Sequence, residues 1–354
     1  MRKEIHQRSQ RKNEHVKHAM HQKTGEVLSD FDMVTLLHHS LPDLNMDEID
    51  LSTTIADHHV PVPLYINAMT GGSGWTESIN RKLAGVAAAA SIPMAVGSMH
   101  AALRHEELSS SYSIVREVNP DGLIFANVGA DVSLEGARRA VEMIDADALQ
   151  IHINAPQELI MPEGDRDFKS WRSNIESIIG HVEVPVIVKE VGFGMSRKAL
   201  LTLKALGVRH VDISGKGGTN FARIENARRK SGDMSYLGEW GISTIRALLE
   251  SQSVQSDMWV MASGGISTPL DAVKCLALGA RSVGMSRILL KSVEEAGVDE
   301  TIEYVNTFHN QMKRIAVMVN AATIEELRKT PLVLDPELLS WVSQRQLVLN
   351  EREI

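Results

Sequence analysis

The segment MWVMASGGISTPLDAVKCLALG (residues 258–279) decides the fold class. A largely apolar run ends in ASGG, and a stretch with helical periodicity begins near Pro269. Glycines after a strand let backbone N–H groups approach an anion, and the start of a helix adds a favourable dipole. A buried strand, a glycine turn and a helix in this order are typical of one unit of an α/β protein.

Seven further segments of the chain repeat this order. The eight candidate strands are residues 63–68, 92–97, 122–128, 147–153, 185–191, 208–214, 258–264 and 281–286. Strands that are buried on both faces and alternate with helices indicate a parallel sheet. Eight units predict a closed (β/α)8 TIM barrel, and an open doubly wound sheet is the alternative. We expect an N-terminal extension (1–60), a barrel domain (61–354) and a helical C-terminal tail after Ile288.

Composition excludes several classes of protein. The chain has 354 residues, of which 43% are hydrophobic and 23% charged, as in soluble globular proteins. Its formal net charge of -8 argues against general nucleic-acid binding. The single Cys275 excludes an internal disulfide and a clustered-cysteine metal site. No apolar run approaches the roughly 18 residues of a membrane span, and no signal core is evident, so we expect a cytoplasmic protein.

Active sites of such barrels lie at the carboxyl ends of the strands. Each predicted strand ends in glycine or a hydrogen-bonding group. ASGGIST (262–268) and VGMSR (283–287) follow the seventh and eighth strands, where these barrels bind phosphate. Turn glycines alone are the simpler explanation of either motif, but their joint position favours a phosphate site.

HINAPQE (152–158) crowds polar groups at the end of the fourth strand. His152, Asn154, Gln157 and Glu158 fall within seven residues, and such groups are costly to bury unless something binds them. One carboxylate among neutral neighbours suits Mg²⁺, which keeps waters and shares its carboxylate with substrate phosphates. The alternative is a polar strand end satisfied by its own neighbours.

Two basic segments suggest ligand contacts. Lys189, in PVIVKEVG, is either paired with a fixed acid or faces a ligand. Its neighbour Glu190 points to the other face of the strand, so we favour the ligand. RKNEH (11–15) is either a solvated charged tail or a diphosphate-binding segment that folds over the barrel mouth.

Seven motifs together suggest a family. They are RKNEH, NAMTGG (67–72), GSMHAAL (97–103), the HxNxxQE pattern of HINAPQE, VKEVGFGMS (188–196), DISGKGGTNFARIE (212–225) and ASGGI (262–266). In this order, across nearly the whole chain, they resemble the FMN-dependent type 2 isopentenyl-diphosphate delta-isomerase family. VKEVGFGMS and HxNxxQE are the most specific, because the wider group of FMN barrels does not share them.

The resemblance implies a role for individual residues. The diphosphate would be bound by Arg11 and Lys12, and Mg²⁺ by Glu158. The remaining substrate contacts would be Ser98, His152, Asn154 and Gln157, and the catalytic residues would be Lys189, His152 and Gln157. The FMN contacts would be Ala68, Met69, Thr70, Gly71, Ser98, Asn127, Lys189, Ser214 and Thr219, with the phosphate end at Gly264, Gly265, Gly284, Met285 and Ser286.

The implied reaction belongs to isoprenoid biosynthesis. It interconverts isopentenyl diphosphate and dimethylallyl diphosphate by an allylic 1,3-proton shift, with no net electron transfer. Reduced FMN, produced by NADPH, would act as the acid–base group through a cationic intermediate, with Lys189 stabilising the anionic reduced flavin. Among the strand-end groups, no carboxylate other than Glu158 is evident that could replace the flavin as the acid–base group. The family usually forms tetramers or octamers, so a homo-oligomer is expected.

Two other functions remain open. An FMN-dependent 2-hydroxy-acid oxidase would need a histidine base near the sixth and seventh strands, and His210 is the only histidine there, inside a strand. A non-catalytic flavin-binding protein would need neither RKNEH nor Glu158. Magnesium dependence of turnover would separate these functions from the isomerase.

Overall fold

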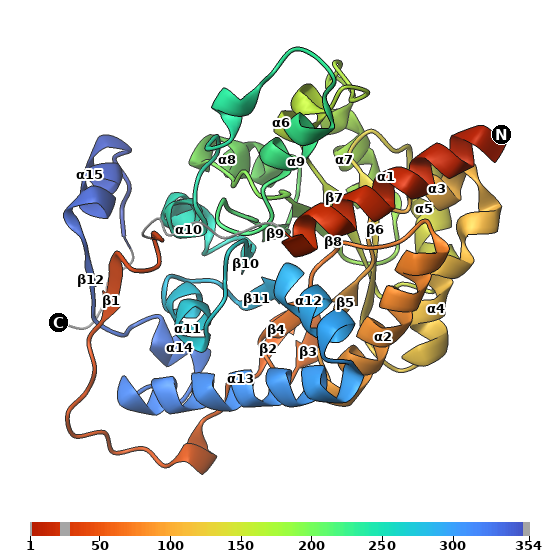
Figure 1. Cartoon of the computed structure of the whole chain (residues 1–354). Helices are drawn as coiled ribbons and strands as arrows, with labels where there is room; N and C mark the ends of the chain where they lie inside the picture. The colour runs from red at the N-terminus through yellow and green to blue at the C-terminus, as the bar shows by residue number, and fades with distance from the viewer. Residues whose placement is uncertain (1, 22–28, 350–354) are drawn as a thin grey trace.

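A computed structural model describes residues 2–21 and 29–349 of the chain. Eight parallel strands form a closed barrel at its centre (Figure 1). In chain order they are β4 (Leu64–Ile66), β5 (Met94–Ala95), β6 (Ile124–Gly129), β7 (Ala148–His152), β8 (Val186–Lys189), β9 (His210–Asp212), β10 (Trp259–Ser263) and β11 (Ser282–Met285). Pairing of β11 with β4 closes the ring. The (β/α)8 TIM barrel is therefore confirmed, and the open doubly wound sheet is excluded.

Helices connect the strands and cover the barrel. They are α2 (Gly74–Ala90), α3 (His100–Arg104), α4 (Ser110–Val118), α5 (Leu134–Met143), α6 (Ala155–Ile160), α7 (Trp171–His181), α8 (Arg197–Ala205), α9 (Phe221–Arg228), α10 (Thr244–Ser251), α11 (Pro269–Ala277) and α12 (Arg287–Glu295). Thr268 starts α11 with a capping box, since it accepts from the Asp271 N–H while Asp271 accepts from its own N–H. The long interval between the sixth and seventh barrel strands contains α9 and a short 3-10 helix (Ser235–Leu237).

Two apolar cores hold the barrel together. The larger lies between the barrel wall and the helices, and the smaller fills the interior with inward-facing side chains such as Phe125 and Ile187. A hairpin of β2 (Thr53–Ile55) and β3 (His58–Val60) adds Ile55 and Val60 to the inner core. Its two turn residues both have positive φ, as in the tight hairpin turns that match strand twist. The hairpin therefore closes the barrel interior on the side away from the strand ends.

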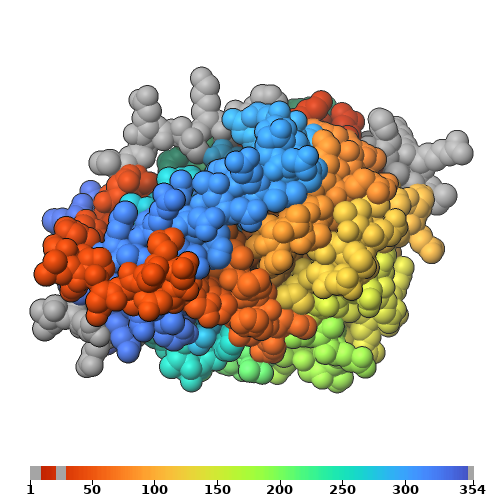
Figure 2. All heavy atoms as spheres, turned by 90° about the horizontal axis from the view of Figure 1, so that it is seen from below, coloured from red at the N-terminus to blue at the C-terminus, as the bar shows by residue number. Residues whose placement is uncertain are grey.

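The N-terminal extension contacts both the barrel and the C-terminal tail. Helix α1 (Arg2–His21) crosses the barrel face in Figure 1 and buries Val16 and Ala19. Strand β1 (Val34–Leu36) pairs antiparallel with β12 (Leu332–Leu334). In Figure 2 the early residues lie beside the late ones on one face.

The C-terminal tail is mainly helical, as expected, but it also contributes β12. Its helices are α13 (Val298–Met318), α14 (Ile324–Leu327) and α15 (Pro336–Gln344). Across residues 2–21 and 29–349, no helix combines the length and apolar character that crossing a bilayer requires.

The hairpin closure can be tested with Ile55→Ala. Ile55 is 1% exposed in the inner core, so the truncation should cost about 2–5 kcal/mol through lost burial and a residual cavity. Chemical denaturation of the purified variant and the parent measures the difference. A loss of stability no larger than the roughly 0.5 kcal/mol typical of exposed positions would show that the hairpin is not part of the core.

Candidate active site

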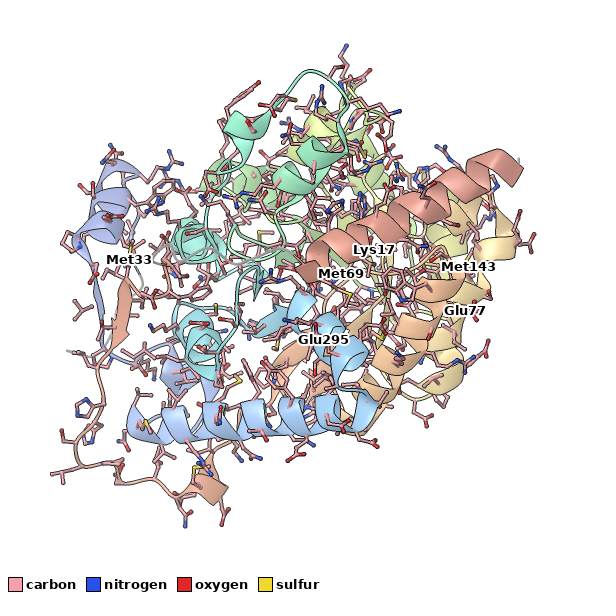
Figure 3. The ribbon with its side chains drawn as sticks, in the orientation of Figure 1. Lys17, Met33, Met69, Glu77, Met143 and Glu295 are labelled. Atoms are coloured by element: carbon pink, nitrogen blue, oxygen red, sulfur yellow. The ribbon has the colours of Figure 1, made fainter. Side chains whose placement is uncertain are left out.

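A cavity of about 1490 Å³ lies at the carboxyl ends of the strands, and all eight strand ends contribute to its wall. The predicted residues that line it are Arg11, Lys12, Ala68, Met69, Ser98, Asn127, His152, Asn154, Gln157, Glu158, Lys189, Ser214, Thr219, Gly264, Gly265, Gly284, Met285 and Ser286. Met69, which lines this cavity, is labelled in Figure 3. The fold therefore brings together groups that are up to 275 positions apart, from Arg11 to Ser286.

Backbone alone builds one end of this cavity. The turns after β9 and β10 pack directly on each other, because a Cβ on Gly218 would come within 2.9 Å of the Gly265 nitrogen. A Cβ on Gly264 would come within 2.0 Å of the Gly215 carbonyl, and Gly264 has a φ of +101°. Only glycine fits here, and the result is a shallow wall of main-chain groups. Such a wall suits a phosphate, whose oxygens accept hydrogen bonds from backbone N–H groups.

Thr70 and Gly71, which are predicted to contact the flavin, are not part of the cavity wall. The Thr70 hydroxyl donates to the side chain of Asn80, and a Cβ on Gly71 would overlap the ring of Tyr112. Both residues instead shape the turn between β4 and α2. They follow two residues that do line the cavity, so sequence spacing alone could not exclude them.

A chain of side-chain hydrogen bonds runs across the barrel below the cavity. The distances are 2.9 Å from His152 Nδ1 to Asn127 Oδ1, 3.1 Å from Asn127 Nδ2 to Gln150 Oε1, and 3.5 Å from Gln150 Nε2 to Asn67 Oδ1. Burial and the nearby Lys189 charge lower the pKa of His152 to about 3. The imidazole is therefore neutral, and since Asn127 Oδ1 can only accept, its Nδ1 carries the proton.

The chain ends at Asp212, a carboxylate with no solvent exposure. It accepts hydrogen bonds from Tyr65 Oη at 2.7 Å, from Asn67 Nδ2 at 2.6 Å and from Ser263 Oγ at 2.7 Å. The Ser214 N–H donates to it as well, at 3.0 Å. Four donors from β4, β10 and the chain after β9 therefore compensate this buried charge.

Lys189 faces the cavity, as predicted, and its ammonium donates to the Glu190 carbonyl at 2.7 Å. Burial lowers its pKa, while the charges of Asp212 and Glu190 oppose that shift. The Glu190 carboxylate points the other way, also as expected. Its Oε2 accepts from the backbone N–H groups of residues 191–194 at 2.5–3.2 Å. Burial still raises the pKa of Glu190 to about 7.

Glu225 is a buried acid next to HINAPQE that the sequence did not suggest. Its Oε1 accepts from Gln157 Nε2 at 2.8 Å and lies 3.1 Å from His15 Nε2. Its Oε2 pairs with Arg228 at 2.5 Å. Burial opposes ionisation, but the nearby His15 and the hydrogen bonds from Gln157 and Arg228 outweigh it and lower the pKa of Glu225 to about 2. Glu158 is therefore not the only carboxylate near the site, and the Gln157 amide is held by an ionised partner.

Glu158 lies half-buried at the cavity wall. Its Oε1 accepts from Asn154 Nδ2 at 2.8 Å and its Oε2 from the Asp165 N–H at 2.9 Å. Burial raises the pKa of Glu158 even though both hydrogen bonds oppose the shift. Within the described residues no group of three or more histidine, cysteine or acidic side chains could hold a metal. A cation here would therefore depend on this carboxylate, waters and a ligand, which suits Mg²⁺ better than a caged metal.

Helix α1 forms part of the cavity wall and is not a solvated tail. Arg11 and Lys12 line the cavity, and Arg11 Nη1 lies 3.6 Å from a carboxylate oxygen of Glu163. Ser9 Oγ donates to the Gly72 carbonyl at 2.9 Å and so ties the helix to the turn after β4. Two basic side chains are thus held above the polar strand end.

Gln150, Asp212, Tyr65 and Glu225 were missed from the sequence. Gln150 and Asp212 stand inside apolar strands, and that placement was the available signal, because buried polar groups need partners. Tyr65 gave no signal, since an aromatic residue in a buried strand is ordinary. Glu225 ends the DISGKGGTNFARIE motif, but nothing local links it to Gln157, 68 positions earlier.

The sequence of this chain is similar to those of known proteins over most of its length. Residues 101–334 match the family model described as FMN-dependent dehydrogenase. The isopentenyl-diphosphate delta-isomerase of Staphylococcus epidermidis is 55% identical over 346 residues, covering 98% of this chain and 99% of that protein. This chain belongs to the isopentenyl-diphosphate delta-isomerase family. The Staphylococcus aureus member is 53% identical over 344 residues, covering 97% of this chain and 98% of its own.

Solved structures support the fold of this family member but not its chemistry. A mandelate oxidase mutant with an FMN adduct has a TM-score of 0.63 at 14% identity, covering 90% of this chain and 95% of its own. A flavocytochrome B2 mutant has a TM-score of 0.65 at 17% identity, covering 96% and 86%. Identities this low establish the shared barrel only.

The state of His152 gives a prediction for the ligand-free family member. With a pKa of about 3, its ring should stay neutral, protonated on Nδ1, from pH 5.5 to 8. Nitrogen NMR of protein labelled at histidine, assigned with His152→Gln, reads the tautomer directly. A His152 signal that titrates near the ordinary histidine value of about 6.5 would contradict the buried network.

Proposed function

We propose that this protein is a type 2 isomerase that interconverts isopentenyl diphosphate and dimethylallyl diphosphate, with FMN and Mg²⁺ as cofactors. The observation that carries the proposal is that Arg11, Lys12 and Glu158 line the same cavity as the glycine wall. Homologues named isopentenyl-diphosphate delta-isomerase, which align over nearly the full chain, support the reaction.

FMN fits the glycine-walled end of the cavity. Gly264, Gly265 and Gly284 would hold its phosphate, and Met69, Ser98 and Lys189 would lie along the ring. In its reduced form FMN would supply the acid–base group for the proton shift. The Lys189 ammonium, held by the Glu190 carbonyl, offers a fixed positive charge on that side. Asn127 and Asn67 are immobilised by hydrogen bonds to side chains below the cavity.

The polar end of the cavity would take the substrate diphosphate. Arg11 and Lys12 would bind its oxygens from α1, and Glu158 would hold the Mg²⁺ that neutralises its remaining charge. His152 and Asn154 line the same part of the wall. An anion next to His152 would favour its charged form and raise its pKa from the low ligand-free value, which turns Nε2 into a donor.

Gln157 would position the hydrocarbon end of the substrate. Its amide nitrogen is bonded to the ionised Glu225, so the orientation of the side chain is fixed. His15 lies 3.1 Å from the same carboxylate and packs beside it. The chain would therefore hold and orientate the substrate, while FMN would supply the acid–base chemistry.

The structure weighs against a 2-hydroxy-acid oxidase. His210, the only candidate base, is 3% exposed, packs against the Trp259 ring and lies 3.5 Å from Asp57 in the hairpin that closes the opposite side. Among the described residues His15 and His152 are the histidines that line the cavity. His152 ends the fourth strand and His15 belongs to α1, so neither comes from the sixth or seventh strand.

Further parts of the proposal rest on the family resemblance. They are NADPH as the reductant, a homo-oligomer of four or eight copies, and action in the cytoplasm. The assignment of residues 1–60 as an extension that completes the mouth is supported by the α1 side chains in the cavity wall.

Counting turnovers per reductant tests the central claim. A proton shift consumes no electrons, so one NADPH per active site should support many turnovers without oxygen. The measurement is dimethylallyl diphosphate formed against NADPH oxidised, under anaerobic conditions with limiting NADPH. A redox enzyme would instead move two electrons with every substrate molecule, so a ratio of product to NADPH near one would end the isomerase proposal.

The metal assignment predicts the effect of Glu158→Gln. The amide keeps the size of the side chain but loses the charge that would hold Mg²⁺, so magnesium-dependent turnover should fall by at least about a hundredfold. FMN should remain bound, because Glu158 lies at the other end of the cavity. Glu303→Gln is the control, since that carboxylate is exposed on α13 and does not line the cavity. A normal magnesium response in Glu158→Gln would remove Glu158 from the metal site.

A further inference from the structure

Three consecutive residues of the turn after α6 contact Glu158. Gly164 packs against its backbone so closely that a Cβ there would lie 2.1 Å from the Glu158 carbonyl oxygen. The Asp165 N–H donates to Glu158 Oε2 at 2.9 Å. The Arg166 guanidinium donates to the Glu158 carbonyl at 2.6 Å. The turn 164–166 therefore holds both the backbone and the carboxylate of one residue.

Arg166 also fixes the shape of the turn. Its Nη1 donates to the carbonyls of Gly164 at 2.5 Å and Asp165 at 2.9 Å, and its Nη2 donates to the Met161 carbonyl at 2.9 Å. The last carbonyls of a helix have no partner inside the helix, so a planar cation with several donors can satisfy them together. One side chain thus fastens the end of α6 to the turn that follows it.

The two oxygens of Glu158 are held from different sides. Asn154, at the start of α6, donates to Oε1 at 2.8 Å, and Asp165, in the returning turn, donates to Oε2. Each oxygen accepts one hydrogen bond in this arrangement, and a carboxylate oxygen has two lone pairs. The side chain is therefore orientated while lone pairs remain for a cation.

The geometry points to Gly164, Asp165 and Arg166 as positioning residues that orientate Glu158 toward a hard divalent cation. This inference rests on the proposed role of Glu158 as the magnesium ligand. Groups that orientate a metal ligand without touching the metal typically contribute about 10- to 100-fold to metal affinity. Arg166 should thus affect magnesium binding, although it lies far from the flavin end of the cavity.

Arg166→Lys is the test, because lysine keeps the charge but cannot bridge several carbonyls in one plane. The half-saturating Mg²⁺ concentration for turnover should rise at least about tenfold, and turnover at saturating Mg²⁺ should stay within about twofold of the parent. Mn²⁺ binding to the enzyme with isopentenyl diphosphate, followed by electron paramagnetic resonance, should weaken by a similar factor. Gly164→Ala, which forces the turn away from Glu158, should change both readings in the same direction.

Arg229→Lys is the matched control. Arg229 Nη1 donates to the Ile160 carbonyl at 2.6 Å, so it secures the end of the same helix without touching Glu158. The half-saturating Mg²⁺ concentration of Arg229→Lys should differ from that of the parent by less than about twofold. FMN content and melting temperature, measured on all variants, report whether each protein is folded.

Three outcomes would overturn the inference. One is a folded Arg166→Lys that keeps the parental Mg²⁺ dependence and Mn²⁺ affinity. Another is an equal change in Arg229→Lys, which would mean that the turn only stabilises α6. The third is tight Mn²⁺ binding in both Arg166→Lys and Gly164→Ala. Absence of isomerase activity in the parent would instead refute the proposed function, while Mn²⁺ binding would still report on the turn.

Discussion

A charge without access to solvent lies at the centre of the barrel, and the site above it depends on how that charge is compensated. Asp212 is 0% exposed, and its hydrogen-bond donors come from Tyr65, Asn67, Ser214 and Ser263. An ion in such a place is tolerated only when its partners are fixed around it. The same bonds set the position of Asn67, which connects through Gln150 and Asn127 to His152. The strand ends are thus coupled into one rigid floor.

The two ends of the cavity are built in different ways. At one end glycines bring the main chain of two turns together, and the wall offers backbone groups with little side-chain freedom. At the other end, side chains from α1, α6 and α9 meet around HINAPQE, and acidic and basic side chains occur there together. The first end suits a cofactor that stays bound, because its wall cannot rearrange. The second suits a ligand that must enter and leave, because its contacts are made by side chains that can exchange partners.

The sequence predicted most of the barrel and much of the cavity wall, for physical reasons that particular residues show. Buried strands that alternate with helices leave little choice of sheet, and the glycines at the ends of β10 and β11 do line the cavity. The direction of a side chain could not be predicted. Thr70 follows Met69, which lines the cavity, but the Thr70 hydroxyl points toward Asn80. Contacts between distant segments were also out of reach. Glu225 and Gln157, and β1 and β12, meet only because the whole chain has folded.

The pairing of β1 with β12 has a consequence for how the protein is made. Residues 34–36 leave the ribosome early, but their partners at 332–334 come near the end of synthesis. Residues 29–33, which line the cavity just before β1, therefore cannot reach their final place until almost the entire chain has been translated. Contacts so distant in sequence carry a large loop-closure cost and form late. A nascent or prematurely truncated chain would thus possess the barrel strands before it possesses a complete cavity wall.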